Sequence, residues 1–554
     1  MIVLDGESLR IRDVVRVARS APGEVRVVLG EAARSRMARS RSAVEQLVAE
    51  GRVAYGITTG FGAFKDRVIG PDQLNELQRN LVLSHAVGVG PEFDPPATRA
   101  IILVRANQLA RGHSGIRVEV VERLLALLER GVLPCIPQQG SLGSSGDLAP
   151  LAHLALVLIG GGEATVDDER MGGAEALDRV GLEPVALQAK EGLALLNGTA
   201  VMSAVACLAS YDAENVSHSA DIAGALSLEA MEGTGEAYDR RLHEIRPHPR
   251  LVEAAHYMRH LLEGSEFLRA RDPKRVQDAY SLRCLPQVHG SVREAIAYAK
   301  WLLRIELNSA TDNPLIFVDE ATGEVDVISG GNFHGEPVSL AMDYLTMALV
   351  ELANISERRI NRLVDAKENQ GVLPPFLTEE GGLNSGFMIA HYTAASLVSE
   401  NKVLAHPASA DTVPTSADIE DHQSLGTIAA RQCLEVLINT ATIVGIELFA
   451  AAQGIDFRRQ RAGRQLALGV GTAPVFDLIR SHIPFIPKDE WMQPHVLRAK
   501  EVVLSGAVNR AAELAVWRHT HDESGERRPL EGLEDGSMGE HRVQKTETRD
   551  QSGE

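Results

Sequence analysis

Hydrophobic positions recur mainly at helical spacing along this chain. Val121, Leu124, Leu125 and Leu128 fall at i, i+3, i+4 and i+7, so they would form one apolar stripe on a helix. Gly131 follows them, and glycine often ends a helix because it readily adopts the left-handed conformation. This segment therefore predicts a helix that stops at Gly131.

Two further apolar segments also predict helices. From Met342 to Ile355 apolar residues recur every three or four positions, which indicates a long helix. The charged run 357–359 that follows is predicted to lie on a solvated or inter-subunit face. Segment 148–159 is apolar but too short to cross a bilayer, and it carries His153, so we interpret it as a buried helix.

Strand patterns are few. The segments 315–318 and 325–328 are short and apolar, and Thr322-Gly323 between them provides a turn, so we predict one hairpin there. The remaining motifs are glycine-rich and border predicted helices, where functional loops often lie.

The chain is predicted to divide into three regions. Residues 1–200 form a loop-rich N-terminal domain, and residues 201–518 form a core domain of long helices. Residues 519–554 are rich in Glu, Arg, Gly, Thr and Ser and have few apolar side chains. Because burial there cannot offset the entropy lost on ordering, we expect a disordered tail.

Composition and charge narrow the class of protein. The 554-residue chain is 44% hydrophobic and carries a formal net charge of -19. A nucleic acid or an anionic membrane is therefore not expected as a partner, since both attract basic surfaces. The four cysteines lie far apart, which indicates neither a disulfide framework nor a zinc ribbon. The N-terminus has no signal-peptide pattern, so we expect a cytoplasmic location.

The most informative candidate chemistry lies in Gly140-Ser-Leu-Gly-Ser-Ser-Gly-Asp-Leu-Ala-Pro150. If the Gly146 nitrogen attacks the carbonyl carbon of Ser144, a five-membered ring closes. Loss of water, and then of the Ser145 hydroxyl as a second water, leaves 4-methylidene-imidazol-5-one (MIO). That group is an electron sink, which side chains hardly offer and cofactors usually supply. Glycine suits the attacking position because it has no Cβ.

Simpler interpretations of this stretch stay open at the level of the tripeptide. Glycine and serine clusters are usually loops, and Asp147 could merely cap the apolar helix that follows. The glycine spacing suggests a phosphate-binding loop, but the G-K-[ST] ending is missing and G-x-G-x-x-G does not fit.

The wider sequence resembles the aromatic amino acid ammonia-lyases, from about residue 5 to about residue 515. The resemblance is carried by ordered blocks, and these are Tyr55-Gly-Ile-Thr-Thr-Gly-Phe-Gly62, Gly140 to His153, Leu195-Leu-Asn-Gly-Thr199, Tyr280-Ser-Leu-Arg283, Asp312-Asn-Pro314, Gly330-Gly-Asn-Phe-His334, Asn384-Ser-Gly-Phe-Met388 and Ser416-Ala-Asp-Ile-Glu-Asp-His422. Several blocks in the expected order are far more specific than any single motif.

The resemblance implies a mainly α fold with a long central helix bundle of the fumarase/aspartase-like type. It implies a homotetramer whose active sites are shared between subunits. The implied reaction removes ammonia from an aromatic L-amino acid, with MIO formed autocatalytically from Ser144, Ser145 and Gly146. No metal or nucleotide cofactor is expected.

The resemblance also assigns roles to single residues. Tyr55 matches the base that removes the β-proton. A phenol ordinarily titrates near pH 10, so such a base needs charges or backbone dipoles that favour its ionised form. Asn197 matches a residue that holds the cofactor carbonyl or the substrate. Arg283 matches the residue that binds the substrate carboxylate, for which a guanidinium offers two parallel donors.

Further positions match the substrate pocket of the family. Tyr280 and Gln277 lie on the same segment as Arg283. Tyr280 is expected among the catalytic residues, and Gln277 is expected to line the substrate pocket. Phe333 matches an aromatic side chain packed against the cofactor. Taken singly, each of these residues would more often be a structural one.

Substrate choice is predicted from two places. Ser84-His85 and Glu420 resemble the histidine-specific members of the family, in which polar side chains can bond an imidazole; Glu420 is also counted among the catalytic residues. A phenyl ring would leave both polar groups unsatisfied, at about 1–3 kcal/mol each. The expected reaction is therefore elimination of ammonia from L-histidine to give trans-urocanate, in histidine breakdown.

Three departures from the family pattern affect this expectation. Ser144 stands where the family usually has Ala, but its side chain takes no part in ring closure. Ala200 and Ile419 stand where histidine-specific members often carry Gln. The alternatives are a lyase for another aromatic amino acid, a 2,3-aminomutase with the same cofactor, or a non-catalytic helical scaffold.

Overall fold

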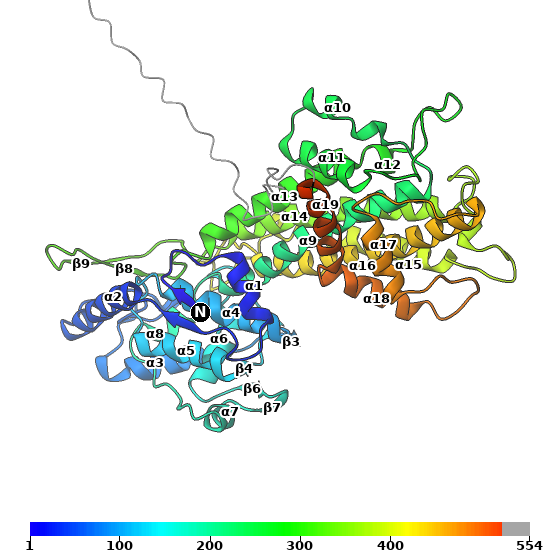
Figure 1. The fold of residues 1–554 in the computed structure, drawn as a ribbon. Helices are drawn as coiled ribbons and strands as arrows, with labels where there is room; N and C mark the ends of the chain where they lie inside the picture. The colour runs from blue at the N-terminus through cyan, green and yellow to red at the C-terminus, as the bar shows by residue number, and fades with distance from the viewer. Residues whose placement is uncertain (523–554) are drawn as a thin grey trace, which may run out of the picture.

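Four long helices lie alongside one another in the computed structural model, which describes residues 1–522 (Figure 1). They are α9 (Ala200–Ala230), α13 (Leu285–Glu306), α14 (Glu336–Val364) and α16 (Gly426–Ala462), and each packs against at least two of the others. Most side chains of α9 are buried all round, as expected for a helix inside a bundle. The mainly α fold with a long central bundle is confirmed.

Shorter helices surround this bundle. They are α10 (Arg240–Glu244), α11 (Pro249–Leu261), α12 (Tyr280–Arg283), α15 (Met388–Leu404), α17 (Ala473–His482), α18 (Gln493–Leu504) and α19 (Ala507–Asp522). In Figure 1, α10 to α12 lie above the bundle, well away from the N-terminal residues.

The N-terminal residues gather at one end of the bundle (Figure 1). Their helices are α1 (Ile11–Arg19), α2 (Glu31–Ala49), α3 (Leu74–His85), α4 (Pro95–Leu109), α5 (Val118–Arg130), α6 (Leu148–Leu158), α7 (Gly173–Arg179) and α8 (Glu191–Leu196). Helices α1 and α4 pack on α9, which joins this region to the bundle through one hydrophobic core.

Short strands connect these helices. β1 (Ile2–Leu4) pairs in parallel with β2 (Val27–Leu29). β3 (Val89–Glu92) pairs antiparallel with β5 (Pro137–Gln139). β6 (Glu163–Val166) pairs antiparallel with both β4 (Leu133–Pro134) and β7 (Glu169–Gly172). The sequence did not predict these strands, because they are short and, unlike segments 315–318 and 325–328, are not two apolar runs joined by a glycine-containing turn. The predicted hairpin is confirmed as β8 (Leu315–Val318) and β9 (Val325–Ile328).

The helices predicted from periodicity are also confirmed. Helix α5 ends at Arg130, and Gly131 follows in the left-handed conformation with φ +71°. Helix α14 contains the whole predicted segment from Met342 to Ile355. Helix α6 is buried along most of its length.

The charged run after that segment is not the solvated face that the sequence predicts. Only Arg358 is exposed; Arg359 is fully buried and its guanidinium bonds both carboxylate oxygens of Glu447 on α16, at 2.5 and 2.8 Å. The hydroxyls of Ser227 and Ser356 donate to the same carboxylate. The prediction was wrong because the helical register of α14 turns this arginine toward α16, where a buried partner compensates its charge.

Segment 148–159 is not the most membrane-like part of the described chain. By length and composition α14 and α16 could each cross a membrane, but 61% and 72% of their most apolar windows are buried inside the protein. Packing between helices accounts for this apolar character, and the expectation that no membrane is involved stays a prediction.

The predicted division into domains stays a prediction. Helix α9, the first of the bundle, begins at Ala200, and α19 continues to Asp522. The rest of the predicted disordered tail lies outside the described residues.

A buried carboxyl in the bundle gives a pH-dependent stability. Glu229 is fully buried; its Oε1 accepts from the Gly469 amide at 2.8 Å, and its Oε2 has no partner. Burial raises the pKa of Glu229 to about 7. The unfolded carboxyl titrates near pH 4.3, so its stabilisation is present below that pH and is lost as pH rises through about 7.

We expect Glu229→Gln to flatten this dependence. Between pH 5 and 8 the wild type should lose on the order of 1–3 kcal/mol of unfolding free energy through this group, which the amide cannot lose. Melting temperatures measured across that range test it, with exposed Glu129→Gln as the matched control. Equal pH slopes in wild type and Glu229→Gln would contradict the prediction.

Candidate functional site

A cavity of about 1130 Å³ lies where the glycine-rich loops of the N-terminal region meet the segments that flank α14 and α16. Seven residues singled out from the sequence line it, and these are Tyr55, Ser84, His85, Ser145, Asn197, Phe333 and Glu420. Segments more than 360 positions apart thus contribute to one pocket.

The Ser-Ser-Gly loop is folded back on itself at the cavity wall. Bridges join Gly143 and Ser144 to Gly146, so the residues whose atoms would close the ring are already paired. Gly146 has φ +74°, and a Cβ there would lie 2.2 Å from the carbonyl oxygen of Gly198. Only glycine fits this position.

Asp147 does not cap the helix that follows it. The structure shows no capping bond from its side chain to α6; Oδ2 accepts from the amides of Val201 and Met202, in the first turn of α9. The other oxygen accepts from the hydroxyls of Ser141 and Thr427. This buried carboxylate therefore ties the Ser-Ser-Gly loop to α9 and α16, across distances in sequence that no local pattern reveals.

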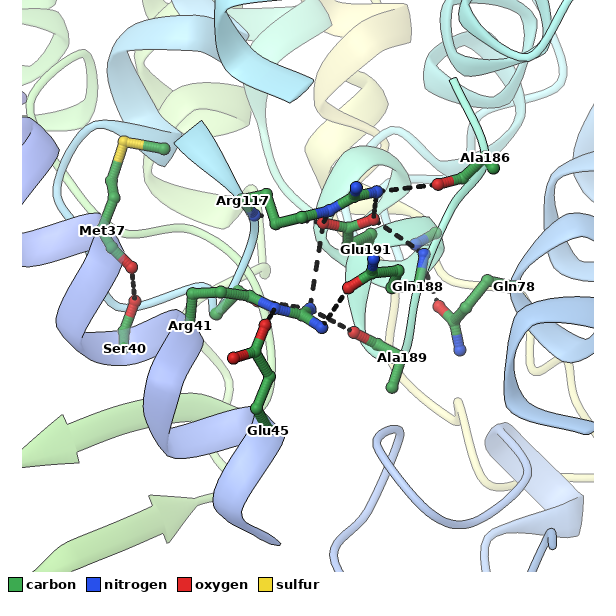
Figure 2. Close-up of polar contacts among 12 residues, drawn as sticks. Met37, Ser40, Arg41, Glu45, Gln78, Arg117, Ala186, Gln188, Ala189 and Glu191 are labelled. Carbon is green, nitrogen blue, oxygen red and sulfur yellow. Dashed lines mark hydrogen bonds and ion pairs between the residues drawn. The ribbon is translucent and has the colours of Figure 1, made fainter. Parts of the chain in front are cut away.

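Helix α8, which leads into Asn197, is held by a buried network (Figure 2). Glu191, at the start of α8, is fully buried and accepts two bonds of 2.7 Å from the Arg117 guanidinium and one of 2.8 Å from the Gln188 amide. Arg41 bonds the carbonyl of Ala189 beside it. A carboxylate at a helix N-terminus is stabilised by the helix dipole as well.

Helix α3 is bonded to the first turn of α8. Gln78 Oε1 accepts from the amides of Gly192 and Leu193, at 2.9 and 3.3 Å, and so satisfies two donors at the start of α8. Because α3 ends with Ser84 and His85, this contact sets one wall of the pocket relative to Asn197.

Asn197 faces the Ser-Ser-Gly loop. Its Nδ2 donates a 2.6 Å hydrogen bond to the carbonyl oxygen of Ser145, and its Oδ1 is buried without a partner. Its own carbonyl accepts from buried Arg105 at 2.6 Å. The donor is thus held rigidly against the oxygen that would be the carbonyl of a cyclised ring.

Tyr55 lies in a tight loop on the cavity wall. The Gly62 amide donates to the Tyr55 hydroxyl oxygen at 3.4 Å, a weak bond that favours negative charge on that oxygen. Gly56, the next residue, has φ +65°, and a Cβ there would approach Leu193 to 2.6 Å. The glycine lets the loop lie against α8.

The predicted specificity residues face the same space. The hydroxyl of Ser84 lies 3.0 Å from His85 Nδ1, and burial lowers the pKa of His85 below its ordinary value, partly offset by the nearby Glu420 carboxylate. The imidazole is therefore neutral at pH 7. Ile419 also lines the cavity, whereas Ala200 is buried in the first turn of α9 and does not.

Five predicted residues do not line the cavity formed by the described residues: Ser144 and Gly146 flank Ser145 at its wall, and the other three lie far from it. Gln277, Tyr280 and Arg283 belong to the segment around α12, well away from α6 and α8 (Figure 1). Tyr280 is 72% exposed, and the Arg283 guanidinium lies over its ring at 4.5 Å. Within one chain, the expected carboxylate-binding group does not reach the expected base.

One cluster has the donor types of a metal site, which the sequence did not predict. Ligand atoms of His334, Glu336 and His422 lie within 4.8 Å of one another. The His334 Nδ1 atom already accepts the Glu336 amide at 3.3 Å. The metal-free enzyme stays a prediction.

Sequence reasoning missed the residues behind the pocket. Gln78, Arg105, Asp147 and Glu191 are all buried polar side chains that position site residues. No local pattern singles out Glu191, because its arginine partners lie 74 and 150 positions away.

Comparison with known proteins gives the class to which this fold and pocket belong. Residues 9–481 match the family of aromatic amino acid lyases, and the chain belongs to that family. It is 59% identical to histidine ammonia-lyase of Chloroflexus aurantiacus over 511 residues, which cover 92% of this chain and 98% of the relative.

Two solved structures are also similar. Histidine ammonia-lyase from Trypanosoma cruzi is 40% identical with a TM-score of 0.84, over 93% of this chain and 95% of that one. Tyrosine aminomutase from Streptomyces globisporus is 36% identical with a TM-score of 0.86, over 93% and 98%.

Proposed function

We propose that this lyase eliminates ammonia from L-histidine to give trans-urocanate. The observation that carries the proposal is the meeting of His85 and Glu420 with Ser145 in one cavity. A histidine side chain presents a ring N–H and a ring nitrogen, so a carboxylate and an imidazole in the wall can bond both. The relatives named histidine ammonia-lyase support the same substrate.

We further propose that the tripeptide is converted to MIO. The Gly146 nitrogen bonds the Ser144 carbonyl carbon, whose oxygen leaves as water; Ser145 then loses its α-proton and hydroxyl as a second water. The paired loop, the position that only glycine fits and the Asn197 donor on the Ser145 carbonyl all suit this ring. The group supplies an electron sink for the elimination.

The side chains supply the remaining steps. Tyr55 takes the β-proton onto its phenolate oxygen, which the Gly62 amide stabilises. Asn197 Nδ2 stabilises negative charge on the carbonyl oxygen it bonds, and its free Oδ1 can accept an N–H of the substrate amine. The neutral imidazole of His85 and the carboxylate of Glu420 orient the imidazole of the substrate.

Lys65 and Arg67 line the cavity, but Arg283, the residue matched to the substrate carboxylate, does not. We propose a homotetramer in which Arg283, Tyr280 and Gln277 of another subunit complete each site. The support is their separation from the cavity within one chain and the exposure of Tyr280. Reduced cysteines suit the proposed cytoplasmic location, and all four are free.

A product assay on the purified enzyme tests the proposed function. L-histidine, L-phenylalanine and L-tyrosine are offered separately, and released ammonia is measured with the ultraviolet absorbance of the unsaturated acid. We expect urocanate and ammonia from L-histidine, and at least about tenfold lower kcat/KM with the other two, which leave polar groups unpaired.

Chromatography of the same reactions tests the aminomutase alternative. The structural similarity to tyrosine aminomutase makes this test necessary. A β-amino acid without net ammonia release would contradict the lyase. Cinnamate or coumarate without urocanate would contradict the substrate.

A further inference from the structure

The first residue of the tripeptide is bonded to the residue that would recognise the substrate ring. Ser144 Oγ donates a 2.6 Å hydrogen bond to Glu420 Oε2, across 276 positions in sequence. The Thr415 hydroxyl lies 3.4 Å from the same oxygen. Among the described residues no hydrogen bond is made to Oε1, so one carboxylate oxygen is held and the other is free.

The backbone around Glu420 does not determine where its carboxylate points. Main-chain bonds pair Glu420 with Thr415, and the Gln423 side chain bonds the Glu420 carbonyl at 2.7 Å. These contacts place the Cα but leave the side-chain torsions free. The bond from Ser144 is therefore the strongest contact that orients the carboxylate, because at 2.6 Å it is much shorter than the 3.4 Å contact from Thr415.

We propose that Ser144 is a positioning residue: its hydroxyl holds Glu420 so that Oε1 faces the ring N–H of the substrate. This inference rests on the proposed histidine lyase function. An alanine at this position could not make the bond. The Ser144 side chain would thus set substrate choice while its backbone takes part in the ring.

The competing explanation is an electronic one. A hydroxyl beside the ring would change the electrophile itself, and so would alter turnover of every substrate by a similar factor. A positioning role predicts that the effect is confined to imidazole substrates and disappears when Glu420 cannot act as a carboxylate.

A double-mutant cycle on the full-length enzyme separates the two. We expect Ser144→Ala to keep the two-water mass deficit and to lower kcat/KM for L-histidine roughly tenfold or more, mainly through KM. In a Glu420→Gln background the same substitution should change kcat/KM less than about twofold. Ser144→Thr, which keeps the hydroxyl, should recover most of the loss.

Each other outcome would overturn the inference. Unchanged kinetics in Ser144→Ala would show that the bond has no role, and an undiminished effect in the Glu420→Gln background would favour the electronic explanation. Loss of the mass deficit would assign Ser144 to ring formation. If the wild type makes no urocanate, the proposed function fails first, and the positioning role fails with it.

Discussion

Replacing Ser145 by alanine is expected to lower kcat for ammonia release by at least about a thousandfold, or about 4 kcal/mol in activation free energy. Alanine has no hydroxyl to lose, so the methylidene cannot form, although the Gly146 nitrogen and Ser144 carbonyl that close the ring are unchanged. The remaining side chains provide a base and hydrogen bonds but no electron sink.

Intact mass and activity measured on one preparation test this expectation. The wild type should be lighter than its sequence by two waters, and Ser145→Ala by one or none. Ser144→Ala is the matched control, because the same hydroxyl is removed one residue earlier and the two-water deficit should persist. Near-normal lyase activity in Ser145→Ala would refute the mechanism.

Mixing two inactive variants is expected to restore activity if the sites are shared. Tyr55→Phe removes the proposed base, and Arg283→Met removes the proposed carboxylate-binding group; each should lose about 10²–10⁴-fold in kcat/KM. Tyr55 lines the cavity, whereas Arg283 lies well away from the N-terminal residues in the same chain. A site that takes these residues from different subunits can be complete in a mixed tetramer.

Random assembly gives a quantitative expectation. With equal amounts of the two variants refolded or co-expressed together, a shared site receives both intact residues in about one quarter of cases. Activity should therefore recover to about a quarter of the wild-type value. The control mixes Tyr55→Phe with the Tyr55→Phe/Arg283→Met double variant. It should recover no activity, because neither chain carries Tyr55. The absence of recovery in the first mixture would mean that each chain builds its own site.

Local sequence patterns correctly predicted those secondary-structure elements that depend on residues close together in the sequence. The stripe that ends at Gly131 became α5, and the turn at Thr322-Gly323 became a hairpin, because each depends on contacts within a few residues. Seven of the predicted site residues line one cavity, and their functional roles stay predictions.

The buried polar contacts could not be predicted in that way. Arg359 was expected on a solvated or inter-subunit face and is fully buried within the chain against Glu447, 88 positions away. A cap on α6 was one alternative for Asp147, whose carboxylate instead bonds α9 and α16. In each case the side chain is compatible with several partners, and only the packing of distant helices selects one.

The sequence by itself determined the helical architecture and the electrophile that the chain can form, because periodicity and the Ser144-Ser145-Gly146 motif are properties of contiguous residues. Only the tertiary structure decided how that chemistry is arranged. It brought Glu420 to Ser144, left Arg283 away from Tyr55, and placed Asn197 on the Ser145 carbonyl. Those distances depend on how whole helices pack, and no segment of the chain encodes them alone.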